Sequence, residues 1–321
     1  MSSDSDSSSP IKVLVVGTGA LGSVYAWRLQ TSGQTEITAV CRSNYDVVST
    51  KGFEIQSKLF GTHTFKPSKV VRTVDEATET YDYILICTKA LPNLSDNSSI
   101  ITSAVRSPTT AIVLIQNGIG IEDPFVARFP DNPVISVVAY IDASQPANGL
   151  IEHGTNVGLV MGAHPLSARL AQIWNATGVK CLVSDKIQAF RWLKLVWNAS
   201  FNTISVVSGG NDTRKMLEDP GCRKLIRDTM GEVYRLGEAA VGEKLPAFMG
   251  IEGPDMYLAY TEREDSTVWP SMLMDFKAGR PMEHAVILGR PLEIARELGV
   301  DVPRLEAIHA LLVMVEKQRQ G

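Results

Sequence analysis

The sequence predicts an α/β N-terminal half, built on a doubly wound and mostly parallel sheet, and an all-α C-terminal half. Two observations support this fold class. From Ile11 to Ser184, short continuous apolar runs alternate with helical segments, as expected for strands that are covered on both faces. After Ser184 the strand pattern stops and long helical patterns follow. Since 321 residues suffice for about two domains, we expect an α/β domain over 11–185 and a helical domain over 186–321.

The predicted elements follow in chain order. Continuous apolar runs predict strands at 11–16, 36–41, 81–88, 111–116 and 134–141, with a helix at 20–33. Around Leu150 the pattern changes, and it predicts an antiparallel hairpin at 149–154 and 156–162, a helix at 166–178 and a strand at 180–184. In the second half, helical patterns cover 191–204, 220–242, 253–263, 269–279, 290–299 and 303–318. Several begin at a proline or end at a glycine, as helices often do.

Composition narrows the classes of function. The net charge is −4 and 21% of residues are charged, so nothing indicates a nucleic-acid partner or binding to a membrane surface. No apolar run approaches the ~20 residues of a membrane span. The four cysteines lie far apart and the five histidines form no metal-binding motif. We therefore expect reduced thiols and no metal.

The first ten residues, MSSDSDSSSP, are predicted to be a disordered tail. They contain nothing that could be buried to offset the cost of ordering. They also lack the apolar core of a signal peptide and the arginines of a transit peptide. A cytoplasmic location is the expectation, and the oligomeric state stays open, a homodimer included.

A glycine-rich stretch, Gly17-Thr18-Gly19-Ala20-Leu21-Gly22, connects the first strand to the first helix. This context makes GxGxxG a dinucleotide-binding signal, because the glycines permit a tight turn and close approach to a pyrophosphate. The N-terminus of the helix would then bind the anion. A plain strand-to-helix turn is the alternative interpretation.

The residue after the second strand predicts the cofactor. NAD sites usually place Asp or Glu there to bind the ribose 2′-hydroxyl, whereas this chain has Arg42. A guanidinium can grip a 2′-phosphate through two parallel hydrogen bonds. We therefore predict NADP (NADPH) as cofactor, with a solvated loop arginine as the alternative.

Two further loops follow predicted sheet strands at their carboxyl ends, where open α/β sheets bind ligands. One contains Lys89 and the other Asn117 with Gly118. Their motifs alone do not separate a binding role from a surface charge and an ordinary turn.

The helical pattern at 191–204 carries a polar ridge. Lys194, Asn198 and Asn202 stand at steps of four, so each would lie roughly 40° round from the last on an α-helix. An amine and two amides in an otherwise apolar helix suggest a proton donor and two substrate anchors. A lysine that extends to solvent and two amides bonded to backbone would also fit.

These features, with CTKA at 87–90, QNG at 116–118 and SMLMDFKAGRPME at 271–283, occur in an order that resembles ketopantoate reductases (2-dehydropantoate 2-reductases). The resemblance covers nearly the whole chain after the serine tract. It implies a Rossmann-like domain, a helical domain, and a cleft between them for NADPH and a 2-oxo acid. The reaction it implies is reduction of ketopantoate to pantoate in pantothenate biosynthesis.

The resemblance also implies residue roles, carried over by position. Lys194 would be the catalytic lysine and Glu283 its carboxylate partner; Asn198, Asn202 and Ser271 would bind substrate, and Lys89 and Asn117 would lie beside the nicotinamide and substrate. Asp275 and Arg280 are expected to form a structural charge pair at the turn of Gly279.

Two positions depart from the family pattern. Thr203 follows Asn202 where many members have proline, and an apolar run follows Glu283. Reduction of another small 2-oxo acid or ketone therefore stays open as an alternative. A third possibility is an NADPH-binding sensor without turnover, whose sign would be loss of Lys194 or Glu283; both residues are present.

Overall fold

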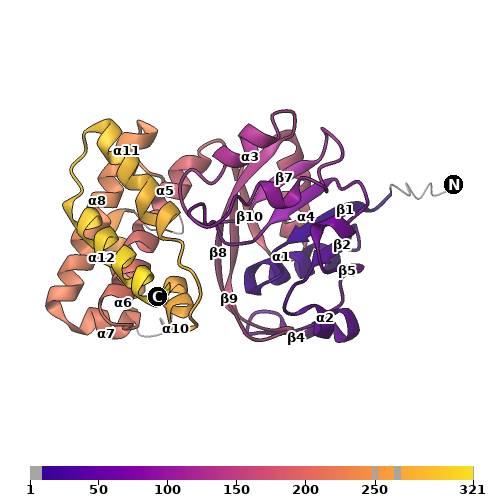
Figure 1. Ribbon diagram of the computed structural model, residues 1–321, viewed down its shortest axis with the longest axis horizontal. Helices are drawn as coiled ribbons and strands as arrows, with labels where there is room; N and C mark the ends of the chain where they lie inside the picture. The colour runs from indigo at the N-terminus through magenta and orange to yellow at the C-terminus, as the bar shows by residue number, and fades with distance from the viewer. Residues whose placement is uncertain (1–8, 248–249, 251, 264–268, 321) are drawn as a thin grey trace. The chain divides into compact units, whose positions relative to one another are not determined.

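The computed structural model describes residues 9–247, 250, 252–263 and 269–320, and the chain divides into two compact units (Figure 1). The first unit comprises Met1–Thr88, Ser98–Gln116 and Pro124–Asp185; the second comprises Lys89–Asn97, Asn117–Asp123 and Lys186–Gly321. The range 11–185 expected for the α/β domain therefore differs from the first unit, because two short segments within it belong to the second. Of the predicted tail, residues 1–8 lie outside the described part.

The first unit is built on one sheet, and the predicted fold class is confirmed. In the described residues the strand order is β4-β3-β9-β8-β7-β6-β1-β2-β5, with β10 paired to β9. The central strands are parallel, and the antiparallel pairs are β3 with β4 and β8 with β9. The strand bounds are β1 Ile11–Val16, β2 Thr35–Val40, β3 Phe53–Ser57, β4 Gly61–Phe65, β5 Lys69–Val71, β6 Tyr83–Ile86, β7 Ala111–Leu114, β8 Val134–Ala147, β9 Leu150–Gly162 and β10 Lys180–Ser184.

Both faces of the central strands are buried. Val13 and Val15 of β1 join a core with Val24 and Leu29 of α1 (Ala20–Thr31). Leu170 and Trp174 of α4 (Pro165–Ala176) complete the same core. On the alternate face of the strands, Leu14, Ile84 and Ile112 are fully buried as well. The continuous apolar runs of the sequence follow from this two-sided burial.

The predicted hairpin between 149–154 and 156–162 is wrong, because residues 150–162 form the single strand β9. The turn instead joins β8 to β9 at Asn148 and Gly149, where Gly149 has a φ of 78°. Asn-Gly is the preferred pair for such turns. Near Gly154 the chain stays extended, and the Asp142 carboxylate of β8 accepts hydrogen bonds from the backbone N–H groups of Thr155 and Asn156.

Several short elements lie where the sequence predicts none. They are α2 (Tyr45–Lys51), β3, β4, β5, the 3₁₀ turns η1 (Val74–Glu76) and η2 (Ser99–Ile101), α3 (Asp123–Arg128) and α7 (Thr213–Glu218). Strand β4 shows why they are hard to predict: four of its five residues are exposed, so it has no apolar alternation for a pattern to detect.

The second unit is helical in its described residues. Its elements are α5 (Ile187–Trp197), η3 (Asn198–Asn202), α6 (Thr203–Val207), α7, α8 (Pro220–Val241), α9 (Gly253–Thr261), α10 (Ser271–Lys277), η4 (Ala285–Gly289), α11 (Arg290–Leu298) and α12 (Pro303–Gln320). Two of these, η3 and η4, are π-helical turns, which are rare and are frequent at functional sites. The predicted uniform helix over 191–204 is therefore interrupted by η3.

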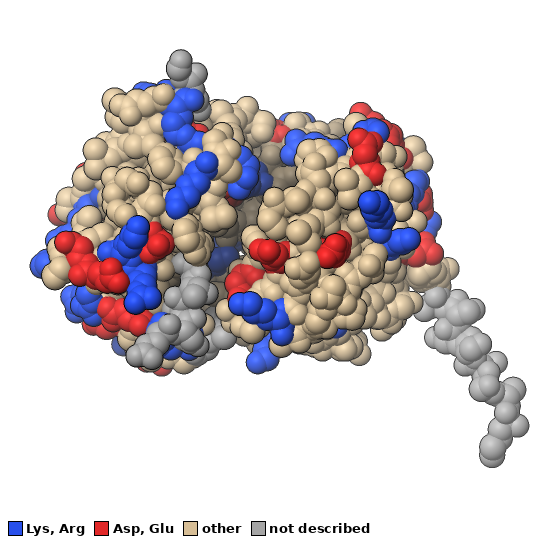
Figure 2. Space-filling view, turned by 90° about the horizontal axis from the view of Figure 1, so that it is seen from below, with Lys and Arg blue, Asp and Glu red and all other residues tan. Residues whose placement is uncertain are grey.

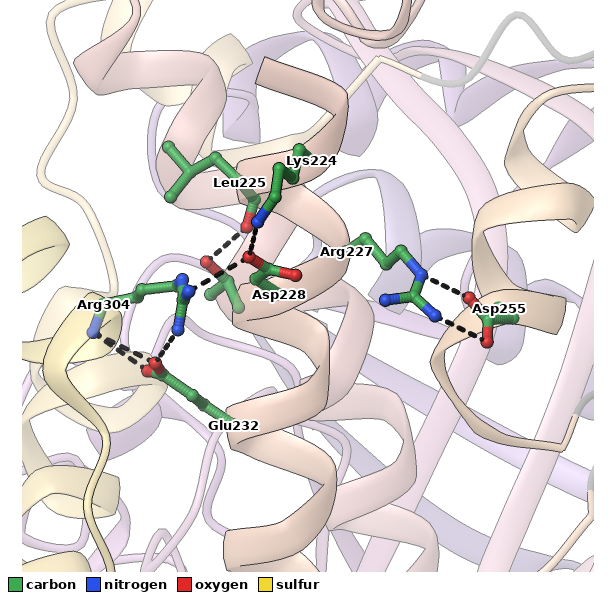
Figure 3. Close-up of polar contacts among 8 residues, drawn as sticks. Lys224, Leu225, Arg227, Asp228, Glu232, Asp255 and Arg304 are labelled. Carbon is green, nitrogen blue, oxygen red and sulfur yellow. Dashed lines mark hydrogen bonds and ion pairs between the residues drawn. The ribbon is translucent and has the colours of Figure 1, made fainter. Parts of the chain in front are cut away.

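Ion pairs along α8 connect it to two other helices of this unit (Figure 3). Glu232 of α8 is 1% exposed and accepts hydrogen bonds from the backbone N–H groups of Arg304 and Leu305. These groups lie in the first turn of α12, where backbone donors lack partners within the helix. Arg304 also pairs with Glu232 and Asp228. The carboxylate thus caps α12 and fixes it to α8.

Charged side chains of both signs are interspersed on the face shown in Figure 2. Within the described part of the chain, no helix is both long and apolar enough to span a membrane.

Candidate functional site

The glycine loop, Gly17–Gly22, is shaped by contacts within the first unit. Gly17 has a φ of 100°, and a Cβ there would lie 2.5 Å from the backbone nitrogen of Thr88. A Cβ on Gly22 would lie 2.2 Å from the carbonyl oxygen of Gly17. At Gly19, the N-cap of α1, the nearest atom would be Gln145 Oε1 at 4.0 Å. The loop therefore packs tightly at its ends and leaves space at its middle glycine, as pyrophosphate binding requires.

The segment after β2 is tied to this loop. Arg42 is exposed and its carbonyl accepts a 3.2 Å hydrogen bond from the backbone N–H of Tyr45. Asn44 is buried and donates to the carbonyl of Thr18 at 3.0 Å. The sequence-based site did not include Asn44, because its contact with Thr18 joins positions 26 residues apart and its side chain does not cap α2.

Lys194 lies on α5 in the second unit and contacts Asn117 of the same unit. Its Nζ donates to Asn117 Oδ1 at 2.8 Å. Burial and, to a lesser extent, the charge of Arg191 lower the pKa of Lys194, the carboxylate of Glu283 opposes them, and the resulting pKa is about 8. The ammonium is thus a much stronger acid than an ordinary lysine, whose pKa is near 10.4.

Glu283 is buried and its Oε1 accepts a hydrogen bond from the backbone N–H of Ala90 at 3.0 Å. Burial raises the pKa of Glu283, while the Ala90 hydrogen bond and the charges of Lys89 and Lys194 oppose the rise. The structure therefore brings Lys89, Asn117, Lys194 and Glu283 into one group within the second unit. Together with Asp275, these residues are called the polar cluster below.

Asp275 connects Lys89 to Arg280. The buried Asp275 carboxylate forms an ion pair with the Lys89 ammonium and a 3.0 Å ion pair with Arg280 Nε. The backbone N–H of Arg280 also donates to the Asp275 carbonyl at 2.9 Å. The predicted charge pair at this turn is confirmed, and Lys89 is held by it.

The turn η3 buries both asparagines of the predicted ridge. Asn202 is 1% exposed, and neither its amide oxygen nor its amide nitrogen has a hydrogen-bond partner among the described residues. Asn198 is buried too. Leaving a buried polar group unpaired costs about 1–3 kcal/mol. Asn202 therefore has unused hydrogen-bonding capacity in the turn that follows the helix of Lys194.

Ser271 is the first residue of α10 and is exposed. No hydrogen bond between described residues joins its side chain to the polar cluster. Its predicted contact with substrate stays a prediction.

Arg191, near Lys194, and its partner Glu122 were missed by the sequence-based site. Arg191 is 4% exposed, and its Nε donates to Glu122 Oε1 at 2.8 Å. Its Nη1 donates to the carbonyl oxygen of Gly118 at 3.2 Å. An arginine three positions before a lysine in an apolar helix was the signal available in the sequence.

Comparisons with known proteins agree with this fold. Residues 13–165 match the family model "Ketopantoate reductase PanE/ApbA", and residues 186–316 match that of its C-terminal part. A crystal structure of 2-dehydropantoate 2-reductase from Methylococcus capsulatus is 36% identical, with a TM-score of 0.85 over 97% of this chain and 98% of that one.

Two further relatives show the breadth of the similarity. The meiotically up-regulated gene 72 protein of Schizosaccharomyces pombe is 32% identical over 95% of this chain, which spans only 57% of that relative. D-mandelate dehydrogenase, solved with NADH and anilino(oxo)acetate, shares the fold at 18% identity, with a TM-score of 0.84 over 97% of this chain and all of that one.

The fold and the matched models define the class, an oxidoreductase with a Rossmann-like unit and a helical unit. The chain belongs to the ketopantoate reductase family. Members of this family bind NAD(P)H.

Proposed function

We propose that the chain uses NADPH to reduce a small 2-oxo acid, and that this acid is ketopantoate (2-dehydropantoate), with pantoate as product. The observation that carries the proposal is the Lys194 ammonium. It is partly buried, bonded to Asn117, influenced by the Glu283 carboxylate, and acidic enough to titrate near pH 8.

The chemistry needs a proton donor at the ketone oxygen. Bound NADPH supplies the hydride to the carbonyl carbon. Charge then develops on the carbonyl oxygen, and Lys194 would stabilise that charge and deliver its proton to give the alcohol. Because the pKa of Lys194 is lowered to about 8, most molecules would still carry the proton at pH 7, and they would release it more readily than an ordinary lysine.

The surrounding groups suit an acid with both a carboxylate and a hydroxyl. Asn198 and Asn202 offer amide donors and acceptors, and Asn202 has both sets unused among the described residues. Burial raises the pKa of Glu283, so this carboxyl can accept from, or when protonated donate to, a substrate hydroxyl. We assign Ser271 to substrate on the resemblance alone.

The two departures from the family pattern each have a packing role in the second unit. Thr203 is buried, and its hydroxyl donates to the carbonyl of Ala199 at 2.6 Å. In the apolar run, Val286 packs against Gly118 and accepts a 3.0 Å hydrogen bond from the backbone N–H of Ile119. Both positions therefore serve the local fold of the second unit.

NADPH is proposed over NADH because of Arg42. Its exposed guanidinium follows β2, at the position where a carboxylate would bind the ribose hydroxyl of NAD. Asn44 fixes the backbone of this segment to the glycine loop, which supports a defined position for Arg42. Lys89 and Asn117 are proposed to lie beside the nicotinamide.

The substrate assignment is tested with a panel of 2-oxo acids and ketones, followed by loss of NADPH absorbance. The panel includes ketopantoate, its 4-deoxy analogue and bulkier aryl oxo acids. A site that binds the substrate hydroxyl can reject an analogue lacking it by ~10⁴-fold. We expect kcat/KM to be much higher for ketopantoate than for the 4-deoxy analogue. We expect Glu283→Gln to reduce this ratio of kcat/KM values. Equal kcat/KM for both acids in the wild type would rule out ketopantoate.

With ketopantoate as substrate, the product connects the chain to pantothenate biosynthesis. The cytoplasmic location expected from the sequence belongs to the same proposal, and cell fractionation would test it.

A further inference from the structure

We propose that Arg191 is a positioning residue of this site, which holds the 117–123 segment so that Asn117 lies against Lys194. Because the role rests on the function proposed above, it adds a residue to that site that acts through Asn117 and Lys194 without touching substrate.

The first support is the geometry of α5. Arg191 and Lys194 are three residues apart and so project from neighbouring positions on one face of the helix. Both reach the same short segment: Arg191 donates to the Gly118 carbonyl at 3.2 Å, and Lys194 donates to Asn117 Oδ1 at 2.8 Å. Two consecutive residues of the segment are thus held by two cations from one helix.

The second support is that Arg191 forms hydrogen bonds near both ends of the segment, with Gly118 and with Glu122. At the far end of the segment, Glu122 Oε1 accepts from Arg191 Nε at 2.8 Å and from Gln188 Nε2 at 3.0 Å. A planar guanidinium can make several such bonds in fixed directions, which an ammonium cannot. The side chain therefore sets the shape of the turn between Asn117 and Glu122.

The other side of the segment is held by η4. Gly118 has a φ of 101°, and a Cβ there would lie 2.5 Å from the Val286 side chain. The backbone N–H of Ile119 donates to the Val286 carbonyl at 3.0 Å. The segment is therefore fixed between α5 and the turn that follows Glu283. Any freedom of Asn117 is limited by Arg191 on one side and Val286 on the other.

Charge gives a readout that separates this role from simple packing. Arg191 on its own helix and Glu283 beside η4 are among the charged groups that act on Lys194. Glu283 is in turn influenced by Lys89 and Asp275. The pKa of Arg191 is itself lowered by burial, against the charge of Glu122 and its hydrogen bond. Removing the arginine charge should therefore raise the pKa of Lys194. Removing the Glu122 charge leaves the positive charge of Arg191 without its partner, so it should lower the pKa of Lys194.

The test compares Arg191→Met, Arg191→Lys and Glu122→Gln with the wild type. Arg227→Met serves as the matched control, because Arg227 is half-exposed on α8 and pairs with Asp255 away from the polar cluster (Figure 3). Lys194 is titrated in the full chain without ligands, by its pH-dependent labelling with trinitrobenzenesulfonate and peptide mass spectrometry. The pH profile of kcat on the best 2-oxo acid is measured in parallel.

We expect Arg191→Met to move the Lys194 titration upward by about half a pH unit or more. It should also lower kcat by about tenfold or more, since a small displacement of a reacting group greatly lowers the rate. Glu122→Gln should move the titration downward. Arg191→Lys keeps the charge, so it should hold the titration near the wild-type value while losing part of kcat. Arg227→Met should change neither quantity.

Folded Arg191→Met protein with an unchanged Lys194 titration and unchanged kcat would overturn the assignment. If Arg191→Met fails to fold, Glu122→Gln and Arg191→Lys decide the question. A titration that Glu122→Gln leaves unmoved, together with full kcat in Arg191→Lys, would overturn the assignment as well. Opposite titration shifts without turnover on any 2-oxo acid would support the role of Arg191 in placing Lys194 and would instead overturn the proposed function.

Discussion

The glycine loop of the first unit and the Lys194–Asn202 stretch of the second unit differ in how their polar groups are satisfied. In the loop, Thr18 donates its hydroxyl to the Val40 carbonyl at 2.8 Å, and its own carbonyl accepts from Ser23 and Asn44. In the stretch, Lys194 is partly buried with a lowered pKa, and the buried amide of Asn202 has no hydrogen-bond partner within the described part of the chain.

This difference indicates whether substitutions in each region should change stability or turnover. The polar groups of Thr18 in the loop are hydrogen-bonded within the folded chain, and the tight contacts of the loop contribute to the stability of the first unit. The stretch keeps groups that are unfavourable without a ligand, a state that proteins tolerate mainly at functional sites. Substitutions in the loop should therefore act first on stability, and substitutions in the stretch should act first on turnover.

The largest effect is expected for Lys194→Ala. Loss of a general acid typically costs ~10²–10⁴-fold in rate, and we expect kcat to fall by that factor while NADPH binding persists. Lys224→Ala is the control, since Lys224 is an exposed lysine of α8 that pairs with Asp228 (Figure 3). Steady-state kinetics measure kcat, and NADPH fluorescence titration measures cofactor binding. A wild-type kcat in the Lys194→Ala variant would show that Lys194 is not the proton donor.

The second effect tests the loop. Gly17→Ala combines a φ of 100° with a Cβ only 2.5 Å from backbone, so strain and overpacking should together lower stability by roughly 2–5 kcal/mol. Gly209→Ala is the matched control, because Gly209 has a φ of 92° with open space around it. It should lose only the strain part, roughly 1–2 kcal/mol. Urea denaturation measures both, and equal losses would show that the close contact at Gly17 is unimportant.

The third effect concerns the unpaired amide. Asn202→Leu should raise the free energy of unfolding by about 1 kcal/mol, since a buried polar group without partners is replaced by an apolar one. The same variant should lose about tenfold or more in kcat/KM. Asn132→Leu is the contrast, because the Asn132 amide donates to the carbonyls of Ser107 and Thr110 and its loss should destabilise. If Asn202→Leu destabilised as much as Asn132→Leu, Asn202 would have a structural role.

The last prediction concerns the wild type, whose activity and stability should both depend on pH. Since the pKa of Lys194 is lowered to about 8, kcat should be halved near pH 8 and fall about tenfold per pH unit above it. The sign for stability is opposite. Between pH 8 and the ordinary lysine pKa the unfolded chain holds the extra proton, so the free energy of unfolding should rise with pH in this window. A flat kcat profile from pH 7 to 10 would contradict the proton-donor role.

Much of the fold could be predicted from the sequence because burial on both faces leaves a continuous apolar signal, as in β1, β6 and β7. The β3–β4 hairpin could not, since β4 is exposed and gains its place from pairing with β3. The continuity of β9 through Gly154 could not either, because the Asp142 carboxylate that holds the backbone there comes from another strand.

The candidate site was partly visible for the same physical reasons. Lys194 and Asn202 could be recognised because burying a polar side chain is unfavourable, so polar residues within an apolar helical pattern indicate a function. Arg191 stood in the same pattern, yet its partners Gly118 and Glu122 are about 70 residues away in sequence, and only the folded chain brings them together. The resemblance to ketopantoate reductases, and not the spacing, pointed to Glu283 as the partner of Lys194. The structure gives its carboxylate a backbone donor at Ala90.

The π-turn at Asn198–Asn202 has a consequence for chain length. A single π-turn is equivalent to one residue inserted into an α-helix, so every side chain after it is rotated by about 100° relative to an uninterrupted helix. Deleting one residue within η3 would restore a regular helix and leave α6 facing its present neighbours, so the change would fall on the turn that carries Asn198 and Asn202. The number of residues between Lys194 and Thr203 therefore matters as much as their identity. In an alignment of relatives, an insertion or deletion here would signal a rebuilt site even where the lysine and both asparagines were present.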